Sequence, residues 1–218
     1  MNIVILGPQG SGKGTQTALL AEKYNLAHIE TGKILREIAN SNHPRSEEIK
    51  NIMNNGLLVS DKILEEVMVG AMDNQKDKAG FVFDGTPRNL EQYNLIKKIL
   101  EERGESLDKV IVVNISEDES IKRLSARRSC SVCGKVYNII TNPSPNGDFC
   151  ECGGRLFQRE DDRPQLIKKR LQTYHEQTSK VIELAKNDGI LEEINGERPI
   201  EEIFNNIVKS IEIINGKN

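Results

Sequence analysis

The chain has 218 residues, of which 37% are hydrophobic and 29% are charged, and its formal net charge is −3. This length and composition are typical of one compact globular protein and exclude a disordered one. The net charge gives no general attraction for nucleic acid or anionic membranes, so bound phosphate must be held by local clusters of Lys and Arg. The apolar runs are shorter than the ~20 residues of a membrane span, and no signal segment precedes Gly7. We therefore expect a cytoplasmic protein.

The apolar pattern predicts strands that alternate with helices. Short buried strands are expected at residues 2–6, 27–29, 81–84, 109–115 and 190–194. Helical spacing is expected at residues 15–24, 90–103, 117–127, 164–187 and 199–214. This alternation predicts an α/β fold with a parallel sheet that is flanked by helices and binds ligands at the carboxyl ends of its strands.

Two segments interrupt the alternation. Residues 30–59 are polar and mostly helical in pattern. Residues 128–159 contain all four cysteines and little apolar periodicity, so they cannot build much of a core and are expected to be an insertion stapled by a metal ion. The core domain would then consist of residues 1–29, 60–127 and 160–218.

A glycine-rich segment, Gly7-Pro8-Gln9-Gly10-Ser11-Gly12-Lys13-Gly14-Thr15, follows the first predicted strand and opens the first predicted helix. In this context it predicts a phosphate-binding loop, because successive backbone N–H groups cradle phosphate oxygens at the positive end of a helix. Lys13 supplies a mobile cation for the β- and γ-phosphates. The general pattern has Ser or Thr directly after this Lys, whereas here Gly14 intervenes before Thr15. A glycine-rich turn without a ligand is the alternative.

The four cysteines form two pairs, Cys130-x2-Cys133 and Cys150-x-Cys152. Clustered cysteines in a reducing compartment indicate a metal site, and four thiolates predict tetrahedral structural zinc with no open coordination position. The short second spacing strains chelation, so we expect that Cys150 or Cys152 is displaced or that the turn adjusts. Iron in place of zinc and four free thiols are the alternatives.

Several motifs, taken in order, resemble those of adenylate kinases over almost the whole chain. They are the loop Gly7-Pro8-Gln9-Gly10-Ser11-Gly12-Lys13-Gly14-Thr15-Gln16, Thr31-Gly32 with Leu35-Arg36, the segment 56–61, Asp84-Gly85-Thr86-Pro87-Arg88 with Gln92, and then Arg123, Arg127, Arg159, Asp161-Asp162 and Arg170. The cysteine segment is similar to the zinc-bearing lid of some members of that family.

The resemblance implies a P-loop kinase fold with a five-stranded parallel sheet, a monophosphate-binding insertion at residues 30–59 and a zinc-binding lid at residues 128–159. The implied activity is reversible, magnesium-dependent transfer of the terminal phosphoryl group of ATP to AMP, which gives two ADP. Mg²⁺ with ATP and structural Zn²⁺ are the implied cofactors. ATP, AMP and ADP are the implied partners of a monomer that binds neither nucleic acid nor membrane.

The resemblance also implies a role for particular residues. The catalytic set would be Lys13, Arg88, Arg127, Arg159 and Arg170. The ATP-binding set would be Gly10, Ser11, Gly12, Lys13, Gly14, Thr15, Arg123, Arg127, Tyr137 and Arg198. The AMP-binding set would be Thr31, Gly32, Arg36, Leu58, Val59, Gly85, Arg88, Gln92, Arg159 and Arg170. The remaining roles are Asp84 facing magnesium through waters, Asp161 and Asp162 in lid closure, and Cys130, Cys133, Cys150 and Cys152 on zinc.

Other interpretations stay open from the sequence. A kinase that uses UMP, CMP or GMP as acceptor is one, because Lys33 stands where the family often has Asp and Thr86 replaces the usual Phe. A zinc-ribbon nucleic-acid module is another, disfavoured by the acidic balance of charge. Asp161 and Asp162 could also be caps of the helix that begins near Pro164.

Overall fold

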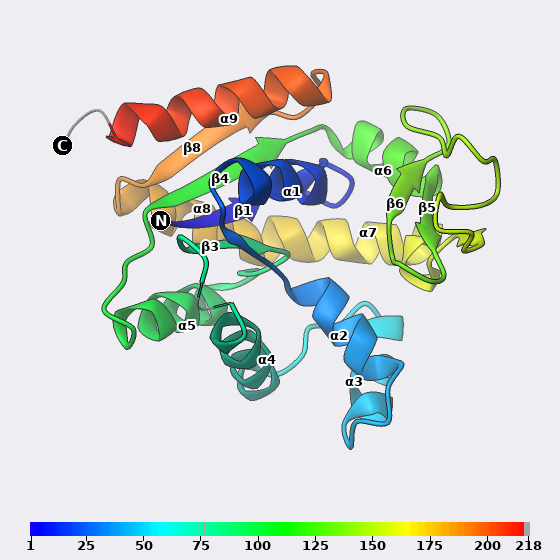
Figure 1. Cartoon of the computed structure of the whole chain (residues 1–218), viewed down its shortest axis with the longest axis horizontal. Coiled ribbons are helices and arrows are strands. Elements are labelled where there is room, and N and C mark those ends of the chain that lie inside the picture. The colour runs from blue at the N-terminus through cyan, green and yellow to red at the C-terminus, as the bar shows by residue number, and fades with distance from the viewer. Residues whose placement is uncertain (76, 216–218) are drawn as a thin grey trace.

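The computed structural model describes residues 1–75 and 77–215, and a five-stranded parallel sheet forms its centre (Figure 1). The strands are β1 (Asn2–Leu6), β2 (Ala27–Glu30), β3 (Phe81–Asp84), β4 (Lys109–Asn114) and β8 (Leu191–Asn195). Their order is β2-β3-β1-β4-β8, and every neighbouring pair is parallel. The predicted α/β class and all five predicted strands are confirmed, with ends shifted by at most one residue.

Helices cover both faces of this sheet. They are α1 (Lys13–Lys23), α4 (Asp61–Asp73), α5 (Leu90–Glu101), α6 (Glu117–Ser125), α7 (Pro164–Thr173), α8 (Ser179–Asn187) and α9 (Ile200–Asn215). Alternate residues of β1 belong to two separate hydrophobic cores. Ile3 and Ile5 pack with α1 and α9. Val4 and Leu6 pack with α4, α5 and α8. A strand that is buried on both faces is mostly apolar, which is why residues 3–6 of β1 form an unbroken hydrophobic run.

Three helix predictions differ from the structure. The helix expected at residues 117–127 ends at Ser125, because Arg127 begins an antiparallel strand and pairs with Asn138. The helix expected at residues 164–187 contains a π-helical turn, η2 (Tyr174–Thr178), between α7 and α8. Helix α4 was not among the predicted elements, although Ser60 caps it by accepting a hydrogen bond from the Ile63 N–H.

Residues 30–59 contain two helices, α2 (Thr31–Ala39) and α3 (Ser46–Asn54), which agrees with their predicted helical pattern. The cysteine segment instead forms a three-stranded antiparallel sheet in the order β6-β5-β7, from β6 (Val136–Asn138), β5 (Arg127–Cys130) and β7 (Leu156–Phe157). Figure 1 shows α2 and α3 below the main sheet and β5 and β6 to its right.

The cysteine segment has very little apolar core of its own. Its apolar cluster consists of the buried residues Cys130, Tyr137 and Cys150, with Leu156 packed against them. A core of this size cannot by itself offset the entropy of ordering some thirty residues, so cross-linking through the cysteines is the natural source of stability. Within the described residues, none of the helices is both long enough and apolar enough to span a bilayer.

Candidate active site

The phosphate loop lies between β1 and α1, at the carboxyl edge of the sheet. Gly7, Gly10 and Gly12 have φ values of 144°, 85° and 91°, which side chains other than glycine adopt only under strain. A Cβ on Gly7 would lie 2.3 Å from the carbonyl oxygen of Val113, so the loop is seated directly on the end of β4. The chain therefore needs glycine here both for conformation and for space.

Lys13 is the first residue of α1 and is half-buried. Its ammonium donates hydrogen bonds to the carbonyl oxygens of Gly7 at 2.8 Å and Pro8 at 2.9 Å. Burial lowers the pKa of Lys13 to about 8, against the opposing charge of Asp84 and with a further contribution from Arg88. The ammonium is thus poised to lose its proton unless an anion holds it.

The loop has Gly14 directly after Lys13, where the general pattern has Ser or Thr, and the surroundings of Gly14 explain this difference. A Cβ at this position would lie 3.1 Å from Oδ2 of Asp84, a carboxylate that ends β3 and is only 8% exposed. A Ser or Thr would therefore crowd Asp84, and the loop hydroxyl is displaced by one residue to Thr15. The same contact places Asp84 beside the start of α1.

The guanidinium groups of Arg36 and Arg88 lie next to two neighbouring glycines. A Cβ on Gly32 would lie 3.3 Å from Nη1 of Arg36, and a Cβ on Gly85 would lie 3.8 Å from Nη2 of Arg88 and 4.0 Å from the Gly32 nitrogen. Arg88 is held in place because its Nε donates to the Gly85 carbonyl at 2.8 Å, while its backbone N–H donates to Oε1 of Gln92 at 2.8 Å. The absence of side chains on both glycines leaves the two guanidinium groups room to converge on one anion.

Asp162 is the hub of a buried ion-pair network, with its side chain 0% exposed. Its carboxylate accepts two hydrogen bonds from Arg127, one of them from Nε at 2.7 Å, and a further one from Arg170 at 3.3 Å. Asp161 lies 2.9 Å from the same arginine, Arg170. The capping alternative for these two acids is wrong, because the N-cap of α7 is Arg163 and no side chain caps it.

Arg159 completes a dense cluster of positive charge. Its Nε donates to the hydroxyl of the buried Ser129 at 2.9 Å. Burial lowers the pKa of Arg159 to about 9, with the nearby charges of Arg127 and Arg36 acting in the same direction. Burial likewise lowers the pKa of Arg88 to about 10. Both shifts come first from burial, and neighbouring arginines add to them, so a polyanionic ligand would stabilise the charged forms of these side chains.

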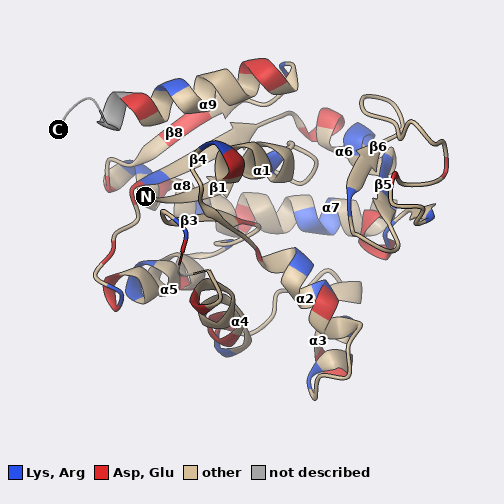
Figure 2. Ribbon diagram, in the orientation of Figure 1, with Lys and Arg blue, Asp and Glu red and all other residues tan. Residues whose placement is uncertain are grey.

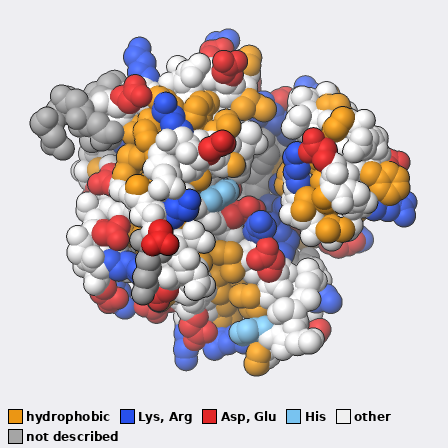
Figure 3. Space-filling model, viewed as in Figure 1, with side chains coloured by type: hydrophobic (Ala, Val, Ile, Leu, Met, Phe, Trp, Pro, Cys, Tyr) orange, Lys and Arg blue, Asp and Glu red, His pale blue; other side chains and the backbone are white. Residues whose placement is uncertain are grey.

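The basic residues of this cluster come from separate elements, with α2, α7 and β5 all carrying Lys or Arg in Figure 2. In the space-filling view the molecule is hollowed between the main body, the cysteine segment and the α2–α3 helices, and charged atoms line this hollow (Figure 3). The structure therefore brings together the predicted residues Lys13, Arg36, Asp84, Arg88, Arg127, Arg159, Asp161, Asp162 and Arg170.

Two predicted ATP-binding arginines have partners outside this cluster. Arg123, on α6, pairs with Glu119 at 2.7 Å and donates to the Gly196 carbonyl at 3.0 Å. Arg198 is an exposed side chain 3.8 Å from Glu202. Arg123 borders the phosphate loop, because a Cβ on Gly10 would lie 3.4 Å from the Cβ of Arg123.

The remaining predicted positions surround the cluster. Gly10 and Gly12 lie in the loop, Thr15 lies in the first turn of α1, and Leu58 and Val59 lie in the connection from α3 to α4. The hydroxyl oxygens of Ser11 and Thr31 are buried without a hydrogen-bond partner among the described residues. Because buried hydroxyls are normally paired, these two are suited to a ligand with polar oxygens.

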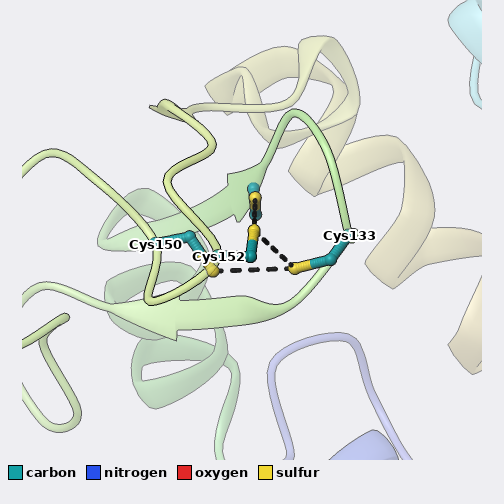
Figure 4. Close-up of side chains that lie close together, drawn as sticks. Cys133, Cys150 and Cys152 are labelled. Carbon is teal, nitrogen blue, oxygen red and sulfur yellow. Dashed lines mark hydrogen bonds between the residues drawn. The ribbon is translucent and has the colours of Figure 1, made fainter.

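The four cysteine sulfurs lie within 4.8 Å of one another. The separations are 3.5 Å for Cys130–Cys152, 3.6 Å for Cys133–Cys150 and 3.4 Å for Cys133–Cys152 (Figure 4). Four thiolates about 2.3 Å from a tetrahedral zinc ion would be roughly 3.8 Å apart, so this set fits such an ion. The expected displacement of Cys150 or Cys152 is not seen, and the short spacing is accommodated by the turn.

Glycines make the two cysteine turns possible. Gly134 and Gly153, with φ values of 73° and 81°, donate their N–H groups to the carbonyls of Cys130 at 3.2 Å and Cys150 at 2.8 Å. A Cβ on Gly154 would lie 2.4 Å from the Cys130 sulfur. The glycines after each cysteine pair therefore bend the chain around the sulfurs.

Tyr137, a predicted ATP-binding residue, has its side chain in the core of the cysteine segment and is 4% exposed. Its hydroxyl lies 3.3 Å from the sulfur of Cys150 and 3.3 Å from Oε2 of Glu151. The hydrogen bond from Tyr137 lowers the pKa of Cys150 to about 6, which favours the thiolate form that metals bind.

Sequence reasoning missed three residues that hold the arginines. Glu30 pairs with Arg36 at 3.3 Å, Ser129 accepts from Arg159, and the Thr178 hydroxyl donates to the carbonyl of Arg88 at 3.0 Å. Only Glu30 had a local signal, since it ends a predicted strand directly before the Thr31-Gly32 motif. The other two act across the fold and carry no pattern of their own.

A phosphate loop beside a convergent pair of arginines, with further arginines from the cysteine segment and α7, defines a P-loop nucleoside-monophosphate kinase. The sequence pattern of the adenylate kinase family matches residues 5–190 of this chain. The chain belongs to the adenylate kinase family.

Its relatives agree over nearly their full length. The chain is 36% identical over 212 residues to the adenylate kinase of Caldicellulosiruptor saccharolyticus, which covers 97% of this chain and 99% of that protein. It is 41% identical to the adenylate kinase of Methanothrix thermoacetophila over 210 residues, a match that covers 96% of this chain and 97% of that protein. It is 38% identical to the adenylate kinase of Lachnospira eligens over 210 residues, a match that covers 96% of this chain and 99% of that protein.

We expect Asp162→Asn to lower the free energy of unfolding by about 3 kcal/mol, because it removes the buried charge that pairs with Arg127 and Arg170. Urea denaturation measures this loss. Glu160→Gln is the matched control, since Glu160 lies on the same turn, is exposed and pairs with the exposed Arg163; it should change stability by less than about 0.5 kcal/mol. Equal effects of the two substitutions would show that Asp162 is not the hub.

Proposed function

We propose that this nucleoside-monophosphate kinase transfers the terminal phosphoryl group of ATP to AMP, reversibly and with Mg²⁺, giving two ADP. The observation that carries the proposal is the convergence of two anion sites. One is the loop with Lys13, and the other is the Arg36–Arg88 pair above Gly32 and Gly85. The names and near-complete coverage of the relatives support the same assignment.

In this proposal the loop residues Gly10–Thr15 cradle the ATP phosphates, and Lys13 exchanges its backbone carbonyl partners for phosphate oxygens. Arg36 and Arg88 hold the phosphate of AMP as a bidentate clamp. That phosphate is already ionised, so the reaction needs no general base, and no histidine is assigned a role. Magnesium bound with ATP neutralises phosphate charge, and Asp84 would hold its water ligands.

Arg127, Arg159 and Arg170 would gather around the phosphoryl group in transit. Charge on that group spreads over its equatorial oxygens during transfer, so fixed guanidinium groups stabilise the transition state without reorganisation. Ser129 and Asp162 support this role because they hold Arg159 and Arg127 in place. Thr31, Gly32, Leu58, Val59, Gly85 and Gln92 are proposed for AMP, and Arg123, Tyr137 and Arg198 for ATP.

We propose that residues 30–59 and 128–159 close over the two nucleotides, on a core of residues 1–29, 60–127 and 160–218. Closure excludes water, which would otherwise accept the phosphoryl group in place of AMP. Asp161 and Asp162 follow directly after the lid segment, and they pair with Arg127 just before it and with Arg170 on α7, which supports a role in this motion.

A monomer is proposed because one chain supplies all the phosphate-facing side chains. The net charge of −3 supports small-molecule partners over nucleic acid or an anionic membrane. A cytoplasmic location is proposed because four clustered thiolates stay reduced there.

We propose that the cysteine cluster binds one structural zinc ion. The sulfur separations support zinc, and four protein ligands leave no position for a substrate. Iron would fit the same tetrahedral thiolate set, so metal analysis decides between them.

Metal removal should destabilise the lid more than it slows catalysis at room temperature. Metal analysis should find one zinc per chain, and Cys133→Ser should lose it and lower the temperature of thermal unfolding by several degrees. Ser131→Ala, on an exposed residue between the first two cysteines, is the control. Loss of turnover without loss of thermal stability would indicate a catalytic metal instead.

AMP should be the preferred acceptor. Coupled turnover of ATP with AMP, GMP, UMP and CMP tests this directly, and kcat/KM for AMP should exceed the others by at least tenfold. Thr86, which stands where the family usually has Phe, is 2% exposed and lies beside the proposed acceptor site. The same assay measures how Thr86 affects the choice of acceptor. A higher kcat/KM with UMP, CMP or GMP would overturn the assignment of the acceptor.

Affinity for ATP should fall as pH rises through about 8. Lys13 binds phosphate only as the ammonium, and its lowered pKa places the loss of that proton in this range, above which affinity falls by up to about tenfold per pH unit. Titration calorimetry between pH 7.5 and 9.5 measures the slope, because the last pKa of a phosphate ester is about 6 and the charge of the ATP phosphates changes little over this range. Lys13→Met should bind more weakly and lack this slope. The same slope in both proteins would assign it to another group.

A further inference from the structure

Glu30 ends β2 at the carboxyl edge of the main sheet, directly before the Thr31-Gly32 motif. In the register between β2 and β3 it lies opposite Asp84, so it borders the phosphate-facing side of the sheet. It occupies the N-cap position of α2, but its carboxylate makes no capping hydrogen bond to that helix. A negative side chain is thus placed beside a site whose ligands are anions.

The carboxylate of Glu30 is turned toward Arg36. Its Oε1 lies 3.3 Å from Nη2 of Arg36, with the two side chains 32% and 33% exposed. Burial lowers the pKa of Arg36, and Glu30 is the strongest of the negative charges that oppose this effect, ahead of Asp161 and Asp84. Arg36 therefore carries a counter-ion supplied by the protein itself.

Arg88, the other half of the clamp, is held differently. Its Nε donates to the neutral carbonyl of Gly85, and no carboxylate of the described residues lies within ion-pair distance of it. Glu30 therefore forms an ion pair with one arm of the clamp, whereas the other arm is held by a neutral carbonyl.

We propose that Glu30 sets the affinity of the site for AMP by competing with the AMP phosphate for Arg36. This inference rests on the proposed function, in which Arg36 binds that phosphate. When AMP enters, the guanidinium must exchange a carboxylate for a phosphate, and the freed carboxylate stays close enough to repel the dianion. Glu30 thus weakens the binding of the acceptor without touching its base.

The expected size of the effect follows from the exposure of the pair. An ion pair that is one-third exposed and joined by a single contact changes affinity a few-fold, and the added repulsion between carboxylate and phosphate acts in the same direction. Removal of the charge should therefore tighten AMP binding by about three- to tenfold, with a larger change at low ionic strength.

The test uses Glu30→Gln, which keeps the size of the side chain and removes its charge. Titration calorimetry with AMP should give a Kd about three- to tenfold lower than for the unchanged protein, and KM for AMP should fall in step while KM for ATP stays within twofold. Glu37→Gln is the matched control, because Glu37 is an exposed glutamate of the same helix α2. It should leave the Kd for AMP unchanged.

A Kd for AMP that is unchanged or higher in Glu30→Gln would overturn the inference, and a higher value would mean that Glu30 orients Arg36 for binding. The proposed function is tested separately by Arg36→Ala, which should weaken AMP binding strongly. In the Arg36→Ala background, Glu30→Gln should lose most of its effect. If Arg36→Ala left AMP binding intact, the assignment of Arg36 to the AMP phosphate would fail, whatever Glu30 does.

Discussion

Positive charge that exceeds its own counter-ions is the constraint on which this structure depends. Lys13 and several arginines are brought to one edge of the sheet, and the pKa values of Lys13, Arg88 and Arg159 are all lowered there. Such crowding destabilises a folded protein unless rigid partners hold the charges apart. The buried carboxylate of Asp162 does this for Arg127 and leaves the remaining positive charge for phosphate. The site is thus preorganised for an anion at some cost to the stability of the fold.

The parallel sheet and its glycines explain how so many charges can meet. Strands of one direction end at the same edge, so β1, β2 and β3 deliver the phosphate loop, the start of α2 and Asp84 to one place. Glycine then removes the side chains that would block the contacts, as at Gly14 beside Asp84 and at Gly32 beside Arg36. In these positions the lack of a Cβ serves close approach more than backbone freedom.

The cysteine segment has to be ordered with very little apolar core. Its strands carry few apolar residues, and several of those, such as Val132 and Ile140, are exposed. A metal ion held by four thiolates can order such a segment with almost no hydrophobic core, since its binding free energy is folding free energy. The cysteine segment can therefore stay a small unit, and its β5 strand begins at Arg127, which pairs with the buried Asp162.

The sequence by itself determined the features that depend on neighbours in the chain. Strand positions and the clustering of the four cysteines follow from local periodicity and spacing, and the structure confirms them. Only the tertiary structure decided which residues, distant in the chain, form ion pairs with one another. It turned Asp162 from a candidate helix cap into the partner of Arg127, and it placed Glu30 on Arg36. An ion pair depends on where two remote segments meet in space, and no spacing along the chain contains that information.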